Sequence, residues 1–508
     1  MAQPISSRTR TELHRITLAG MWFNVWLWII SGAAMTQFAR GLHTPDWAFG
    51  LLAALPFVGT LSQLPVSWWM NARGGRRVIF LWTNVVGRLS YLAAALVPWV
   101  LPGSEALWWP LMVGLLAVGW LLMQAAGPPW MNWMADVIPR RVRGRYFARR
   151  AALTAPVAIF LTVGVAYLMD AVPPEAMLAT TSVLLGVAGI FGALDGLMFL
   201  GVHDPQTHES ADERRRRTAN VEMGLRGLLR PLKTQGYRRY MLFNALMNFS
   251  FGFMGHYIWL YVLDVVGWSN LQANLMIIAV PLALQMVTRS AWGRACDRYG
   301  KKPVLVVCWG FACFGSVGWV FITPDSVWLG YMWVMLVSFA WPGVEVANFN
   351  FLLDYSGDRA GGSSAVALNS LAVGIAGTLA GVFAGVVAAW LGAEWRWAVP
   401  VVGVVLTYHG VLILASTALR VLAMFVVLCL HEPEATGTRE SIRMAAGGLW
   451  SNVRQIGGRP VRTSGAALRW AYRVDRKAKK RFEIPLDPNV SEPENVPSPE
   501  GSEAAKTP

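Results

Sequence analysis

Apolar segments of about 20 residues recur along most of this chain, and each is long enough to cross the ~30 Å hydrocarbon core of a bilayer as an α-helix. Of the 508 residues, 14% are charged and 55% are hydrophobic. A soluble chain carries about 25% charged residues. The sequence therefore predicts a protein that crosses a membrane many times, and it excludes a disulfide scaffold, a largely disordered chain and a simple nucleic-acid binder.

Twelve such segments can be counted. The first follows Arg8, Arg10 and Arg15 and is longer than the core of a signal peptide, so we expect it to be retained as a span. The expected fold class is an all-α membrane protein with twelve transmembrane helices. The expected spans cover residues 16–38, 47–70, 78–101, 107–131, 150–169, 176–201, 240–263, 270–292, 303–322, 327–353, 366–391 and 398–425.

Lys and Arg are unevenly divided when alternate loops are assigned to opposite sides of the membrane. One side receives the N-terminal arginines, the basic loops and the basic tail, whereas the other receives only Arg40 and Arg396. Because short cytoplasmic loops carry the excess of positive charge, both termini are expected in the cytoplasm. The net charge of +15 then reflects topology and an anionic inner leaflet as partner, and no nucleic-acid partner is expected.

The two halves of the chain share polar landmarks in the same order. Gly75, Arg76 and Arg77 match Gly300, Lys301 and Lys302, and each triplet begins nineteen residues after a proline. The motif NWMAD at 132–136 matches NFLLD at 350–354, and HDP at 203–205 matches HEP at 431–433. A similar composition of apolar helices does not explain matched polar residues, so we expect two copies of a six-helix unit.

The loop after the eighth span reads GRACDRYGKK and places its signature residues at Gly293, Asp297, Arg298, Gly300, Lys301 and Lys302. It resembles the signature GxxxD(R/K)xG(R/K)(R/K) of the major facilitator superfamily, which in that family recurs between the second and third helices. In the first half Gly75, Arg76 and Arg77 hold their places, but Ala72 stands for the aspartate and Trp68 for the leading glycine.

This resemblance implies a secondary transporter that works by alternating access on a small-molecule substrate. The expected parts are six-helix bundles at 1–202 and 240–430, a cytoplasmic linker at 203–239 and a basic, then disordered, cytoplasmic tail at 431–508. We expect a monomer in a bacterial inner membrane, without enzymatic activity or cofactor, coupled to protons or sodium ions. The alternatives are a non-transporting lipid-handling or solute-sensing protein on the same fold and, among transporters, a drug or amphipath exporter.

The complete copy of the signature is expected to act as a latch. Gly293 allows close helix approach, and the carboxylate of Asp297 can accept bonds from a neighbouring helix N-terminus. The expected partner is the start of the eleventh span at 361–364. The alternative, which is favoured for the first half, is that such a loop only fixes topology through its positive charge.

Charged residues inside spans are costly and are kept only when they are paired or used. Arg88 in the third span and Asp195 in the sixth lie at similar depths. In the resembling family these helices stand away from the pathway, so we predict a structural ion pair.

Glu345 and His256 lie in the tenth and seventh spans, which line the central cavity in the resembling family. Both side chains can change protonation state, so they are candidates for coupling or substrate recognition. Glu345 has no basic neighbour along its helix and is the stronger candidate. For His256, a place near the outer interface is the alternative.

The remaining candidates for the substrate site are neutral. Amides and indoles suit a hydroxylated solute such as a sugar, although core packing explains the indoles equally well. These residues are Asn24, Gln124, Asn244, Asn248, Trp22 and Trp26. The four cysteines have neither CxxC spacing nor a neighbouring histidine, so no disulfide and no metal site is expected.

Overall fold

We describe the protein from a computed structural model, which covers residues 7–138, 140–205, 229–323, 326–356, 362–399 and 404–430. Most of the expected linker at 203–239 and the whole expected tail at 431–508 lie outside these ranges.

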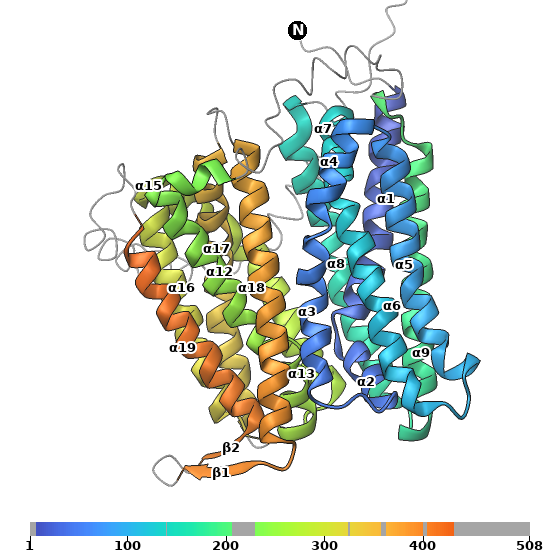
Figure 1. Ribbon diagram of the computed structural model, residues 1–508, viewed down its shortest axis with the longest axis vertical. Coiled ribbons are helices and arrows are strands. Elements are labelled where there is room, and N and C mark those ends of the chain that lie inside the picture. The colour runs from blue at the N-terminus through green and yellow to red at the C-terminus, as the bar shows by residue number, and fades with distance from the viewer. Residues whose placement is uncertain are drawn as a thin grey trace, which may run out of the picture. The chain divides into compact units, whose positions relative to one another are not determined.

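The first half of the chain is entirely helical within the described residues (Figure 1). Two prolines in the first turn of α7 explain why the fourth span breaks after α6, because each proline lacks the backbone N–H that would continue the hydrogen bonding of α6, and proline fits well in the first turn of a new helix. The elements are α1 (Ser7–Ile30), α2 (Ala33–Gly41), α3 (Ala48–Thr60), α4 (Gln63–Arg73), α5 (Arg76–Val100), α6 (Glu105–Ala125), α7 (Gly127–Val137), α8 (Arg140–Ala171), η1 (Pro174–Ala176), α9 (Met177–Met198) and η2 (Phe199–Gly201).

The second half repeats this arrangement with more interruptions. The short α14 starts with a capping box, in which Ser269 and Gln272 satisfy each other's backbone N–H groups. The elements are η4 (Arg230–Lys233), α12 (Gln235–Met254), α13 (Tyr257–Leu260), η5 (Tyr261–Val265), α14 (Asn270–Asn274), η6 (Leu275–Ala279), α15 (Val280–Tyr299), α16 (Lys301–Gly318), η7 (Trp319–Phe321), α17 (Val327–Ser356), α18 (Gly362–Leu391), β1 (Arg396–Val399), β2 (Val404–Thr407) and α19 (Tyr408–Leu428).

Ten helices in the described residues are long and apolar enough to cross a membrane, and the pair α1 and α2, bent by 51°, makes an eleventh span. The expected seventh span at 240–263 is divided at Gly255 and His256 into α12 and α13, and is therefore not a single long helix. Counting this divided span as the twelfth, the structure confirms the twelve-helix, two-bundle fold expected from the sequence, and the chain is a multi-pass membrane protein.

The expected start of the twelfth span at residue 398 is wrong. Residues 396–399 and 404–407 form the antiparallel pair β1 and β2, and the helix α19 begins only at Tyr408. Val399, Val404 and Val405 explain the difference, because β-branched residues favour strands and add hydrophobicity to either structure.

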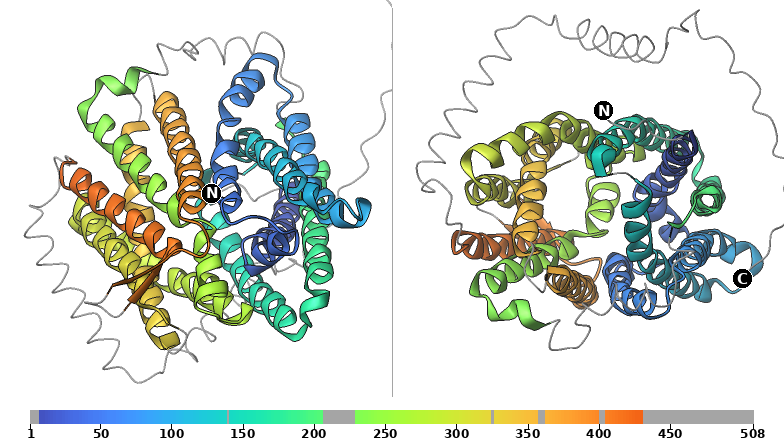
Figure 2. Two further views of the ribbon diagram at one scale, coloured as in Figure 1. Left: turned by 60° about the horizontal axis from the view of Figure 1, so that its bottom comes forward. Right: turned by 90° about the horizontal axis from the view of Figure 1, so that it is seen from above.

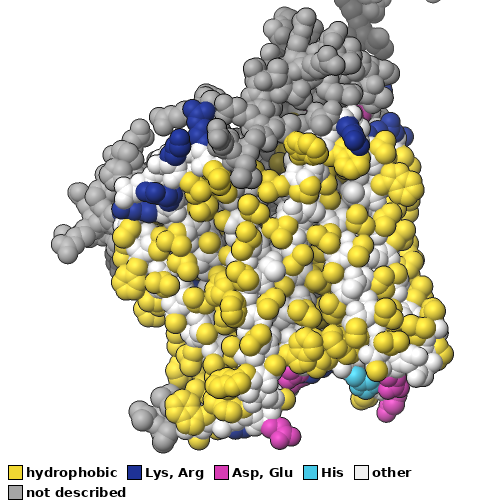
Figure 3. Space-filling model, in the orientation of Figure 1, with side chains coloured by type: hydrophobic (Ala, Val, Ile, Leu, Met, Phe, Trp, Pro, Cys, Tyr) yellow, Lys and Arg dark blue, Asp and Glu magenta, His cyan; other side chains and the backbone are white. Residues whose placement is uncertain are grey.

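Side chains on the flanks of the molecule are predominantly hydrophobic, whereas charge gathers at the ends of the helices (Figure 3). Phe160 and Trp390, for example, expose about four fifths of their surface, 78% and 82%. Figure 3, which has the orientation of Figure 1, shows arginine and lysine at the end where Figure 1 places the α4–α5 and α15–α16 junctions. We call this the basic end, and the opposite end, where α2 meets α3, the acidic end.

The two halves touch most intimately along α3 and α18, which lie side by side in both views of Figure 2. An added Cβ at Gly50 would lie 2.4 Å from the carbonyl oxygen of Gly381, and one at Gly381 would lie 2.6 Å from that of Gly50. Only glycine permits such a backbone contact.

Candidate functional site

A cavity of about 570 Å³ lies between the two halves. Most of its walls are apolar or aromatic, and its polar lining groups are Ser31, Tyr91, His256, Ser338 and Arg420. None of its lining residues is an aspartate or a glutamate. Pockets of ~300–1,000 Å³ with a few convergent polar groups are typical of sites for small organic molecules.

The cavity lies where the first helix of each half is broken. In the first half the break falls between α1 and α2, at Ser31 and Gly32, and in the second half it falls at Gly255 and His256. A broken helix leaves backbone N–H groups without partners, which inside a membrane must be satisfied by protein. The N–H of Ala33 donates to Asn274 Oδ1 of the other half at 3.1 Å. The break in one half is therefore stabilised by the other.

The acidic end is closed by polar contacts between the halves. Arg40 donates to Asp46 Oδ1 at 2.6 Å and also forms an ion pair with Asp264 of the second half. The hydroxyl of Tyr408 donates to the other oxygen of Asp46 at 2.7 Å. Two charged residues of the first half and two polar residues of the second thus share one cluster.

A second contact at the same end surrounds the start of α14. Asp170, near the end of α8, accepts bonds from the backbone N–H of Asn270 at 2.8 Å and of Leu271 at 2.9 Å. Gln37 donates to the side-chain oxygen of Asn270 at 3.0 Å. Among the residues whose side chains the structure describes, every hydrogen bond or ion pair between the two halves belongs to this end or to the adjoining helix break. None of these acidic residues was a candidate from the sequence, although each stands alone at the end of an apolar segment.

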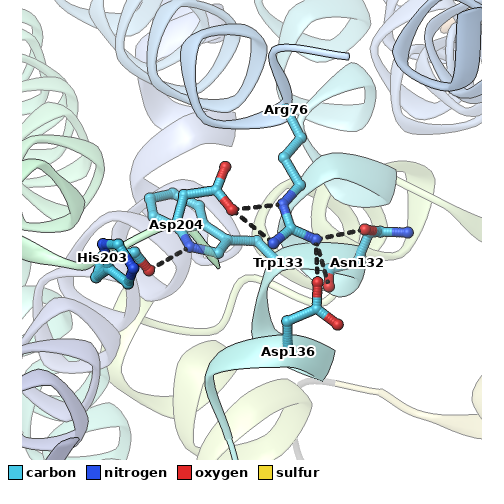
Figure 4. Close-up of polar contacts among 6 residues, drawn as sticks. All are labelled: Arg76, Asn132, Trp133, Asp136, His203 and Asp204. Atoms are coloured by element: carbon cyan, nitrogen blue, oxygen red, sulfur yellow. Dashed lines mark hydrogen bonds and ion pairs between the residues drawn. The ribbon is translucent and has the colours of Figure 1, made fainter. Parts of the chain in front are cut away.

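At the basic end the polar contacts hold each half together internally. In the first half, Arg76 is 1% exposed and donates to acceptors on α7 and on the segment that follows η2 (Figure 4). Its Nε and Nη2 donate to Asp204 Oδ1 at 2.9 and 2.5 Å, and its Nη1 donates to Asp136 Oδ2 and Asn132 Oδ1, both at 2.6 Å. Beside this cluster, the indole N–H of Trp133 donates to the carbonyl oxygen of His203 at 3.0 Å.

The cluster explains why the landmarks of the two halves match. Arg76, Asp136 and Asp204 come from three different landmarks that are distant in sequence and converge at one point. In the second half Lys301 forms an ion pair with Asp354, which are the counterparts of Arg76 and Asp136. The third counterpart, Glu432, lies outside the described residues.

The signature loop of the second half makes no such closure in this structure. Asp297 is exposed, and its carboxylate has no hydrogen bond or ion pair to another described residue. Nothing lies within 4 Å of a Cβ added at Gly293. Arg298 lies over the ring of the adjacent Tyr299, and Gly300 ends α15 with a φ of 93°. Most of the expected partner segment at 361–364 lies outside the described side chains, so the latch stays a prediction.

Glu345 lies in a second cavity, of about 420 Å³, and not in the central one. Its carboxylate forms an ion pair with Arg289 of α15 and accepts a bond from the indole N–H of Trp341 at 2.9 Å. The cavity is also lined by Asn348 and Asn369, whose side-chain oxygens are buried without a described partner. Arg289 lies inside the expected eighth span, and its charge is the sequence signal that could have identified it as a partner of Glu345.

Of the other sequence candidates, only His256 lines the central cavity. The side chains of Asn24, Asn244 and Asn248 each donate to a carbonyl one turn earlier in their own helix. Gln124 donates to the carbonyl oxygen of Pro56 at 3.2 Å, and Trp22 packs its ring 4.8 Å from that of Phe191. These side chains bond or pack within the protein and do not line the central cavity.

Arg88 and Asp195 are brought together by α5 and α9. Arg88 Nη2 lies 3.9 Å from Asp195 Oδ2, and both side chains are less than a tenth exposed. The guanidinium carbon of Arg88 lies 3.4 Å from the ring centroid of Trp26, which is itself 3% exposed. The structure thus places Trp26 beneath this charge pair, with its indole covered.

Comparison with known proteins gives the following picture. A family model of the Major Facilitator Superfamily matches residues 17–372. A search of curated proteins finds no match to the chain. Three solved structures that resemble it are the xylose transporter XylE from E. coli, a bacterial homolog of the human lysosomal transporter Spinster and the nucleoside transporter NupG.

These three likenesses establish the fold. XylE, in a partially occluded inward-open conformation, is 14% identical with a TM-score of 0.59 over 85% of this chain and 100% of that one. The Spinster homolog, inward-facing and unoccupied, is 16% identical with a TM-score of 0.59 over 85% and 100%. NupG is 12% identical with a TM-score of 0.59 over 82% and 98%.

Proposed function

Because the chain belongs to the Major Facilitator Superfamily, we propose that it is a secondary active transporter that moves a small organic solute across a bacterial inner membrane by alternating access. The observation that carries the proposal is the central cavity between two halves whose described polar contacts with each other all lie toward one end. A transporter of this kind exposes one site to the two sides in turn, which requires contacts between the halves that can break at one end while they form at the other.

We infer that the acidic end faces outward and that both termini lie in the cytoplasm, so that the described conformation is closed to the outside. The Lys and Arg at the basic end support this orientation. A cysteine introduced at Arg294, an exposed position of the basic end, should stay unlabelled by an impermeant maleimide in intact cells and react in inverted vesicles. Labelling in intact cells would contradict the orientation.

The solute is expected to carry an apolar body, because aromatic and aliphatic side chains dominate the walls of the cavity. A neutral hydroxylated solute such as a sugar remains a prediction, for which Ser31, His256 and Ser338 are the available hydrogen-bonding groups. Glu345, with its partner Arg289, is the candidate for proton coupling. A carboxylate that pairs with an arginine in one conformation and binds a proton in the other can couple proton movement to the change of conformation.

The decisive experiment is transport in reconstituted liposomes with a panel of labelled solutes. The four native cysteines are first replaced by serine, and cysteines are placed at Arg40 and Asp264. Cross-linking these two positions should abolish transport while solute binding is retained, because the acidic end can no longer open. Transport that continues at the wild-type rate in the cross-linked protein would contradict alternating access.

Glu345→Gln tests the coupling role in the same liposomes. If Glu345 carries protons, the variant should lose accumulation driven by a pH gradient and keep counterflow exchange, which needs no net proton movement. Wild-type accumulation and an unshifted pH profile would remove Glu345 from the mechanism.

A further inference from the structure

Arg420 is a buried cation on the wall of the central cavity. It lies in α19, twelve residues after the helix begins at Tyr408, and is 4% exposed. Its Nη1 donates to the carbonyl oxygen of Ala312 at 2.9 Å, and its Nη2 lies 3.3 Å from the sulfur of Met254. The guanidinium carbon lies 4.4 Å from the ring centroid of Phe251, another residue that lines the cavity.

These contacts leave the positive charge without a counter-charge. No ion pair between described residues involves Arg420, and its Nε is buried without a hydrogen-bond partner. A carbonyl oxygen, a thioether and an aromatic face solvate a guanidinium only in part, and a full charge in the middle of a span is costly unless it is paired or used.

The corresponding place in the first half shows what such an arginine ordinarily has. Arg88 lies twelve residues after Arg76, and Cys313 lies twelve residues after Lys301, so Arg88 and Cys313 occupy equivalent positions in the two halves. Arg88 has a carboxylate partner on the sixth span, Asp195. In the second half the arginine is on the twelfth span and the ninth span offers the thiol of Cys313. Compared with the first half, the arginine has moved from the third helix of the bundle to the sixth, and no described carboxylate faces it.

The cavity provides the surroundings that an apolar anion needs. None of its lining residues is acidic, so nothing there repels a negative charge, and aromatic walls from both halves, including Trp120 and Trp259, surround the space. His256 adds an imidazole to the lining. A carboxylate accepts bidentate bonds from a guanidinium, which a neutral solute cannot do.

We propose that the central cavity takes an organic acid, whose carboxylate pairs with Arg420 and whose apolar body lies against the aromatic walls. The inference rests on the proposed function only in taking this cavity as the solute site. It adds the class of solute and names the residue that selects it.

Binding by the purified full-length protein tests the proposal without transport. Three probes of one shape differ in charge: benzoate, benzamide and benzylamine. The larger 2-naphthoate and 2-naphthamide repeat the acid–amide comparison with more apolar surface. The acids should bind about tenfold or more tightly than their amides, as a charge-assisted bond predicts, and benzylamine should not bind. Equal affinity for acid and amide would overturn the proposal.

Arg420→Gln and Arg420→Met locate the binding. Both variants should remove the difference between acids and amides. In the absence of any acid, Arg420→Met should melt at the same temperature as the wild type or higher, because it removes an unpaired buried charge. The matched control is Arg88→Met, which leaves Asp195 unpaired and should melt lower.

These outcomes separate a binding role from a structural one. If Arg420→Met melts as low as Arg88→Met, Arg420→Gln still reports acid binding, because glutamine can keep the bond to Ala312. Preserved acid selectivity in Arg420→Gln would overturn the proposal. Transport of a solute without acid selectivity would refute this inference and leave the proposed function intact. Acid binding without transport of any solute would support this inference and contradict the proposed function.

Discussion

The two ends of the molecule use their charges in different ways. At the acidic end Arg40, Asp46, Asp264 and Asp170 join one half to the other, and their side chains are partly exposed. At the basic end Arg76 and its two carboxylates join helices within the first half, and the guanidinium is buried. The difference teaches that the two sets of ion pairs break at different cost. The pair of Arg76 with Asp204 is sealed from solvent, whereas the ion pairs of Arg40 remain within reach of water and can be exchanged at lower cost.

The largest effect is expected from Arg76→Gln. The change removes the arginine from its ion pair with Asp204, whose side chain is 4% exposed, and breaking such a buried pair costs about 3–5 kcal/mol. A fall in melting temperature and faster proteolysis of the first half would measure it. Arg77→Gln is the matched control, because the bond that Arg77 makes among the described residues goes to the exposed carbonyl oxygen of Leu200. An Arg76→Gln protein as stable as this control would show that the cluster is not structural.

Arg40→Gln should change conformation more than stability. It removes the ion pairs that Arg40 forms with Asp46 and Asp264, and because the arginine side chain is 32% exposed, these two pairs together contribute roughly 1 kcal/mol. The ratio of open to closed acidic ends should then rise about fivefold. A cysteine at Ser31, a lining residue of the cavity, would report it through faster reaction with a maleimide added from the acidic side. An unchanged rate would mean that these pairs do not hold the end closed.

Asp170→Asn is expected to act in the same direction with a smaller effect. The amide keeps one acceptor oxygen and loses the charge that favours bonds from the N–H groups of Asn270 and Leu271, so a change of about twofold in the same reaction rate is expected. Combined with Arg40→Gln, the two free-energy changes should add if the contacts are independent. A double variant no more open than Arg40→Gln alone would show that the two contacts form one unit.

The smallest effect on the described conformation is expected from Asp297→Asn. The carboxylate is exposed and has no described partner there, so the change in stability should stay within about 0.5 kcal/mol. If Asp297 is a latch of the other conformation, the variant should instead populate the described one more, seen as slower labelling of the Ser31 cysteine from the acidic side. Faster labelling would instead show that Asp297 stabilises the described conformation.

Much of the fold was predictable, because the apolar segments and the paired landmarks are properties of local sequence. Arg76, Asp136 and Asp204 were recognised as matched positions, yet their contact was not predicted, since a sequence does not say which distant helix ends meet. Arg420 and Arg289 lie inside expected spans and were visible as charges, but what each one faces depends on helix packing. The neutral candidates failed to reach the cavity for a related reason: an asparagine in a helix can satisfy itself on its own backbone.

The glycine contact between α3 and α18 has a mechanical consequence. Where Gly50 meets Gly381, the two backbones touch with no side chain between them, whereas further along the same interface Phe57 and Thr60 of α3 lie against Gly377 and Gly374 of α18. The halves can therefore roll over the Gly50–Gly381 contact without moving apart, while the seated Phe57 ring keeps the two helices in register. A single methyl group at Gly50 or Gly381 would force the two backbones apart and block this rolling motion.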